Sequence, residues 1–179
     1  MFPYAAVEDE GRLKNTRIRE HFLTKLFMLA RFRQIKSVES SMKGLVQFHT
    51  KNKFLLMAYN QKEMRILGRI TANLGKRPFS VVVQDYELHL WNVLGKAPRY
   101  TSVINVLLHA LGYFNELSPQ EKSFFLDSLK RYREGKVPLS VLVVLLKSWI
   151  IRFKEDYLAQ QTFFEPYPEG LIEGVNHEK

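Results

Sequence analysis

The sequence of 179 residues contains no cysteine. A chain without cysteine forms no disulfide, holds no zinc ion or iron–sulfur cluster through sulfur, and offers no thiolate nucleophile. The sequence also lacks the glycine-rich phosphate loop, the paired-histidine zinc helix and the nucleophile elbow that mark many enzymes. These absences favour a binding protein over an enzyme, and they leave no residue assigned to catalysis, to a metal or to a cofactor.

Long hydrophobic runs are also missing. The most apolar segment, residues 139–151, is interrupted by Lys147 and is too short to span a bilayer. The first residues run directly into Glu8, Asp9 and Glu10, without the basic and then apolar pattern of a secretory signal. We therefore expect a cytoplasmic chain with no membrane partner.

Acidic residues are scarce in one part of the chain. Residues 12–77 contain sixteen lysines and arginines but only three acids, so this segment carries a charge of +13 while the whole chain carries +9. The remaining residues are mildly acidic. Such an uneven distribution predicts a positive face that attracts polyanions. The alternative is a solvated basic surface that only keeps the protein soluble.

Helical periodicity is abundant. Apolar residues recur at spacings of three and four along most of the chain, and the sequence predicts helices over residues 16–32, 41–59, 60–75, 80–95, 101–115, 118–134, 139–151 and 156–164. Asn60 is expected to cap the third helix, and Ser118-Pro119-Gln120-Glu121 has the pattern of a capping box. The prediction is therefore an all-α, single-domain bundle of seven or eight helices.

The domain limits follow from the same pattern. Residues 1–11 are expected to form an irregular lead-in, residues 12–168 the helical domain, and residues 169–179 a frayed tail. The segment 139–151 is apolar on nearly all sides, which predicts a helix at the centre of the bundle.

Polar residues on two predicted helices are candidates for contacts with a ligand. Asn105, His109 and Tyr113 follow one another at four-residue intervals, which places them in one column on a helix over 101–115. The column is either a buried hydrogen-bond network that fixes the helix register or the lining of a pocket for a base or phosphate. His49 and Lys53 repeat the spacing on an earlier helix, where the lysine would keep the histidine neutral.

Four segments resemble one family. Residues 48–58 (FHTKNKFLLMA) resemble its FHxxxKxLLMAH stretch, and residues 105–114 (NVLLHALGYF) resemble its NVLxHxxGYF signature. Residues 132–139 resemble its YRxGxxPL stretch, and residues 157–161 with 166–168 resemble its closing YLxxQ and PYP. The chain is identified on these motifs as a member of the YbgA-like family, which is described as a domain of unknown function.

The resemblance implies a role. In many members of the family this domain follows an iron–sulfur desulfidase domain that removes sulfur from thiouracil-type bases, including thiouridine in tRNA, and the appended domain is implied to bind RNA. Residues 7–13 are similar to the junction in fused members, so the chain is expected to be a stand-alone relative or the C-terminal part of a fusion. Two positions depart from the family pattern: Tyr59 and Ser148 stand where the family usually has histidine.

The leading hypothesis is a non-catalytic RNA-binding domain, with tRNA as the RNA and an iron–sulfur desulfidase as a further partner. The expected RNA contacts are His49, Lys53, Arg65, Arg69, Lys76, Arg77, Arg99, Asn105, His109, Tyr113, Arg131, Arg133 and Lys136. One alternative is a small-ligand-binding protein or enzyme that uses a polar seam of His49 and His109. Another is a docking module for a desulfidase, bound through the aromatic stretch around Phe163, Phe164 and Tyr167.

Overall fold

The computed structural model describes residues 6–171. Its α-helices are α1 (Thr16–Gln34), α2 (Met42–Ala72), α3 (Phe79–Val93), α4 (Tyr100–Leu111), α5 (Pro119–Arg133), α6 (Leu139–Phe153) and α7 (Asp156–Ala159). Short 3-10 helices cover Arg12–Lys14 and Glu169–Leu171, and one π-helical turn covers Ile35–Glu39. No strand occurs within residues 6–171, which confirms the predicted all-α bundle. Of the predicted lead-in and tail, residues 1–5 and 172–179 lie outside the described residues.

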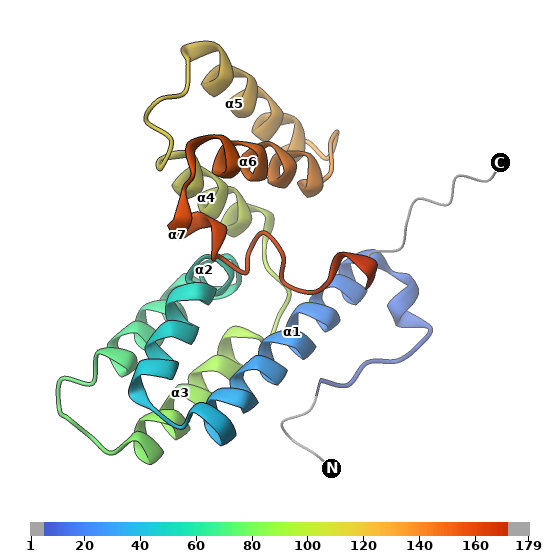
Figure 1. Ribbon diagram of the computed structural model, residues 1–179. Helices are drawn as coiled ribbons and strands as arrows, with labels where there is room; N and C mark the ends of the chain where they lie inside the picture. Colours follow the sequence, from blue (N-terminus) through green and yellow to red (C-terminus); the bar gives the residue numbers. More distant parts are fainter. Residues whose placement is uncertain (1–5, 172–179) are drawn as a thin grey trace.

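Helix α2 consists of two arms that meet at Asn60. The backbone of Asn60 is extended, with φ −157° and ψ 99°, and its side-chain oxygen accepts a hydrogen bond from the backbone N–H of Glu63 at 3.2 Å. This is the cap predicted from the sequence, and it restarts the helix in a new direction. Residues 42–59 form the first arm and residues 61–72 the second, and the two arms lie side by side in opposite directions (Figure 1).

The core has two aromatic centres. Phe32 of α1, Phe48 of α2 and Tyr86 of α3 form one of them, with ring centroids 5.5 to 6.0 Å apart. Phe125 of α5 and Trp149 of α6 form the second, with centroids 5.5 Å apart. All five side chains are buried, so α1–α3 and α4–α6 each pack around aromatic rings.

The segment after α7 returns to the first arm of α2. The buried side chain of Gln161 accepts a hydrogen bond from the Phe54 N–H at 3.1 Å and donates one to the Thr50 carbonyl at 2.9 Å. In a regular helix the Phe54 N–H would donate to the Thr50 carbonyl instead. The neighbouring Thr162 donates its backbone N–H to the Lys51 carbonyl at 3.0 Å. One amide side chain thus fixes the C-terminal segment against the middle of α2.

Two expectations about packing are wrong. Helix α6 was predicted at the centre of the bundle, but Val144 and Ile151 are 63% and 77% exposed. Helix α6 contacts α4, α5 and α7, and these neighbours cover only part of its circumference. Conversely, Phe163, Phe164 and Tyr167 are buried, so they are not free to dock a partner. No helix in the described part of the chain is long and apolar enough to cross a membrane.

Candidate nucleic-acid interface

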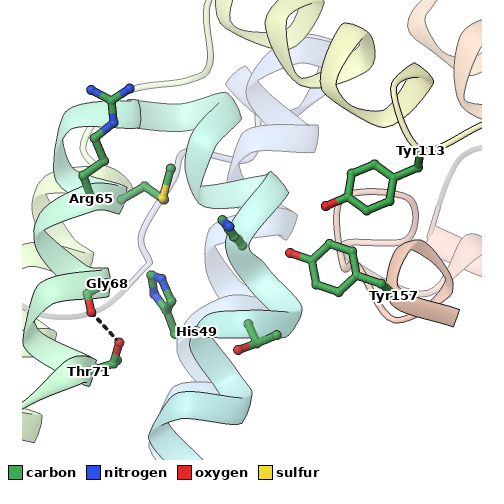
Figure 2. Close-up of a pocket in the computed structure, with 9 residues that line it drawn as sticks. His49, Arg65, Gly68, Thr71, Tyr113 and Tyr157 are labelled. Atoms are coloured by element: carbon green, nitrogen blue, oxygen red, sulfur yellow. Dashed lines mark hydrogen bonds between the residues drawn. The ribbon is translucent and has the colours of Figure 1, made fainter.

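A groove runs along the two arms of α2 and is central to the candidate site. Its middle part is a pocket of about 550 Å³, and Figure 2 shows residues of both arms facing two tyrosines across it. The pocket is lined by His49, Thr50, Lys53, Met64, Arg65, Gly68, Thr71, Tyr113 and Tyr157. Arg65 also lines a hollow with Gln61, Lys62 and Arg69, and Thr71 also lines a hollow with Lys43, Gln47, Asn73, Lys76 and Arg77. We call these three adjoining hollows the α2 groove.

Gly68 of the second arm faces His49 of the first arm. A Cβ atom at this position would lie 3.4 Å from Nε2 of His49, at the short end of ordinary van der Waals contact. The hydroxyl of Thr71 donates a hydrogen bond to the Gly68 carbonyl at 2.9 Å, on the same side of the second arm (Figure 2). His49 of the first arm and Gly68 and Thr71 of the second arm therefore line the pocket together.

His49 is a neutral, structurally engaged residue of this pocket. Its Nδ1 lies 3.1 Å from the hydroxyl of Tyr86, and the side chain is buried. Burial, and secondarily the charge of Lys53, lowers the pKa of His49 to about 4. The predicted influence of Lys53 is therefore present, although burial is the larger cause. His49 adds no positive charge to the groove at neutral pH.

The charge of the groove comes from lysines and arginines that have no acidic partner. Within residues 6–171, none of the groove cations Lys43, Lys53, Lys62, Arg65, Arg69 and Lys76 forms an ion pair. Arg77 is the exception, because it pairs with Asp85. Glu63 is the only acid in α2, and its carboxylate lies 2.6 Å from Nδ1 of His89, away from these cations. The groove therefore presents six unneutralised positive charges.

Two tyrosines form the opposite wall. The rings of Tyr113 and Tyr157 are stacked, with centroids 5.5 Å apart and an interplanar angle of 16°. Phe54 contacts both rings edge-on, at 6.1 Å from each. Tyr113 remains 40% exposed, and Figure 2 shows both hydroxyls directed toward α2. Burial, and secondarily the neighbouring Tyr113, raises the pKa of Tyr157. The pair is a rigid aromatic surface beside a basic groove.

The structure brings together about half of the residues expected to contact RNA. His49, Lys53, Arg65 and Tyr113 line the central pocket, and Arg69, Lys76 and Arg77 line its extensions. Arg99, Asn105, His109, Arg131, Arg133 and Lys136 do not line the groove. Lys136 instead pairs with Glu134 at 2.7 Å and lines a separate cavity.

The polar column on α4 does not exist as predicted. Helix α4 ends at Leu111, and the chain turns at Gly112, where the N–H of Tyr113 donates to the Ala110 carbonyl at 3.1 Å. Tyr113 therefore leaves the helical column and stacks on Tyr157. His109 is exposed, so it joins neither a buried network nor a seam with the buried His49.

Several groove residues were not anticipated. Tyr157 belongs to the closing family motif, to which no RNA contact is assigned, and Lys62 belongs to no motif. Lys62, Arg65 and Arg69 are spaced by three and four residues, which would have marked a basic stripe on one helical face. The described residues contain no group of three or more His, Asp or Glu side chains placed to hold a metal ion.

The fold and this groove define a basic, all-α domain with three adjoining hollows along α2. The sequence profile of the family described as "Protein of unknown function (DUF1722)" matches residues 53–168, and the chain belongs to this family. The chain is also 23% identical over 151 residues to "Uncharacterized protein YbgA" of Escherichia coli (strain K12), which covers 83% of this chain and 89% of that protein. No solved structure matches the chain.

Proposed function

We propose that this protein is a non-catalytic RNA-binding domain and that its RNA partner is a tRNA. The observation that carries the proposal is the α2 groove, which six cations line without an ion pair among the described residues. Two of them, Lys53 and Arg65, share the central pocket with the stacked Tyr113 and Tyr157. Lysine and arginine side chains gain affinity for a phosphate backbone by releasing its counterions. Aromatic rings next to such a groove favour single-stranded or looped RNA, whose unstacked bases can pack on them.

The geometry of the second arm supports a strand that follows the helix. Lys62, Arg65 and Arg69 lie on one face of this arm. Seven residues of helix rise by about 10 Å. A stacked nucleic-acid strand rises by about 3.4 Å per nucleotide, so three cations can follow about three successive phosphates. Tyr113 and Tyr157 then stand across the groove, where the bases of that strand would point.

The partner enzyme is a further part of the proposal, and it rests on the family resemblance. A desulfidase that acts on thiolated tRNA bases would supply the chemistry, and this chain would supply affinity for the RNA. This division of labour between a catalytic partner and an RNA-binding chain fits a sequence without cysteine, whose described residues contain no cluster of metal-ligating side chains. Copurification of the two proteins in the presence of tRNA tests this association.

Binding of a fluorescently labelled tRNA tests the proposal directly. Fluorescence anisotropy at salt concentrations from 50 to 400 mM should give an affinity that falls steeply with salt. With five to six phosphates contacted, the slope of log K against log salt should be about −4. A folded sample that shows no binding at 50 mM salt would refute the proposal, and a slope near zero would refute the electrostatic mechanism.

A further inference from the structure

A second cavity lies on the other side of the first arm of α2. It encloses about 680 Å³ between α1, the segment before Tyr167, and the ends of α4, α5 and α6. Leu55 and Tyr59 of the first arm face this cavity, whereas Thr50 and Lys53 face the α2 groove. Its volume falls in the range of pockets that hold a small molecule. The cavity is therefore separate from the proposed RNA groove.

The cavity walls are rich in aromatic rings. Tyr59, Tyr100, Tyr132 and Tyr167 all line it, and the Tyr100 and Tyr132 rings are 5.2 Å apart. The Tyr59 hydroxyl is fixed by Nδ1 of His21 at 3.0 Å. Rings that are held in place give a large contact area for a planar ligand at a small cost in conformational entropy.

Glu20 supplies the distinctive polar group of the cavity. Its carboxylate is close enough to Tyr59, Tyr132 and Tyr167 to affect the pKa of each phenol. The Glu20 side chain is partly exposed and forms no ion pair within residues 6–171. Partial burial raises the pKa of its carboxyl, and the charge of Arg19 opposes that rise. An ionised carboxylate only accepts hydrogen bonds. A planar ligand in this cavity would therefore be favoured if it carried adjacent N–H donors.

Two cations also line the cavity. Arg17 places one guanidinium nitrogen 3.4 Å from the Pro98 carbonyl, and the Lys136 ammonium pairs with Glu134 on the surface. An exposed ion pair of this kind is weak and exchanges readily for another anion. Arg17 and Lys136 therefore give the cavity two positively charged lining residues.

We propose that this cavity binds a guanine nucleotide, with the base among the tyrosines, its N1–H and N2–H₂ donors on Glu20, and its phosphate at Arg17 and Lys136. Guanine is the standard base with two adjacent donors on its pairing edge. Uracil has a single N–H between two carbonyl oxygens, and a carboxylate repels those oxygens. The site therefore discriminates guanine from uracil through one carboxylate, independently of the α2 groove.

Calorimetric titration of the full chain with GMP and with UMP tests this site. GMP should bind saturably and at least tenfold more tightly than UMP. The variant Glu20→Gln should lose most of that preference, because the amide presents a donor as well as an acceptor. The matched control Glu116→Gln, at an exposed glutamate that does not line the cavity, should bind GMP as the unaltered protein does. Equal binding of GMP and UMP, absence of saturable GMP binding, or an unchanged preference in a folded Glu20→Gln protein would overturn the proposal.

The nucleotide can come from solution or from an RNA strand, and short RNAs separate the two sources. Hexauridylate and a hexamer with one central guanosine should differ in affinity only if the cavity accepts a base within a strand. If Glu20→Gln removes that difference, the strand is a source; if it affects GMP alone, the ligand is the free nucleotide. If the unaltered protein binds GMP but not tRNA, the RNA-binding function is contradicted while this site stands.

Discussion

Neutralising the second arm of α2 should weaken tRNA binding by an amount that depends on salt. The triple variant Lys62→Gln, Arg65→Gln and Arg69→Gln removes three of the six unpaired groove charges. Each lost phosphate contact reduces the slope of log K against log salt by about 0.7 to 0.9. The slope should therefore fall by about 2 units, and the affinity at 0.1 M salt by about 100-fold.

The salt dependence separates this explanation from a folding defect. The three side chains are exposed and form no ion pair within the described residues, so their replacement should change the free energy of unfolding by no more than about 0.5 kcal/mol. Plots of log K against log salt for the variant and the unaltered protein should converge near 1 M salt. A defect in folding would instead lower the variant's affinity by the same factor at every salt concentration, and the two plots would stay parallel.

A matched control uses three lysines outside the groove. The variant Lys96→Gln, Lys122→Gln and Lys130→Gln makes the same change in net charge, and none of these lysines lines the α2 groove. The slope of log K against log salt for this variant should stay within about one unit of the slope for the unaltered protein. If both triple variants lose affinity equally, binding depends on net charge alone and the groove is not the site.

Three other changes have defined outcomes. Tyr113→Ala or Tyr157→Ala should weaken the binding of a single-stranded RNA by about 1–3 kcal/mol, as measured by anisotropy. Tyr113→Phe and Tyr157→Phe should retain the affinity, because phenylalanine keeps the ring; equal loss in the Ala and Phe variants would exclude stacking. The pKa of His49 is about 4 in the folded protein, below its ordinary value, so the unfolded state binds more protons between pH 4 and 6.5. The free energy of unfolding therefore falls as the pH is lowered through that range. Urea unfolding should show this loss, on the order of 3 kcal/mol, and His49→Gln should reduce it; an identical pH profile in the variant would show that His49 is not responsible. Gln161→Ala should lower the free energy of unfolding by about 1–3 kcal/mol, because the Thr50 carbonyl and the Phe54 N–H lose their bridging partner, and an unchanged urea midpoint would contradict that role.

Local features of the fold were predictable because they depend on short segments. Asn60 caps the second arm as its sequence context indicates, and Ser118 accepts a hydrogen bond from the Glu121 N–H at 3.2 Å in the predicted capping box. Glu63 was expected to complete a box with Asn60, but its side chain pairs with His89 of α3 instead. That partner lies 26 residues away, and no local pattern shows it.

The site was only partly predictable because it depends on non-local packing. The positive charge of residues 12–77 indicated a basic surface, but the groove exists because the two arms fold back at Asn60 and meet at Gly68. The prediction of a polar column on α4 was wrong because it extended the helical spacing to Tyr113, whereas α4 ends at Leu111. Periodicity likewise cannot show how many neighbours a helix has, so the apolar α6 was placed too centrally.

The central claim is that RNA lies in the α2 groove, and ultraviolet cross-linking of the protein–tRNA complex followed by mass spectrometry tests it most directly. The cross-linked peptides should contain Tyr113, Tyr157 and residues 61–77. Cross-links confined to the exposed faces of α5 and α6 would contradict the claim, even if the protein binds tRNA.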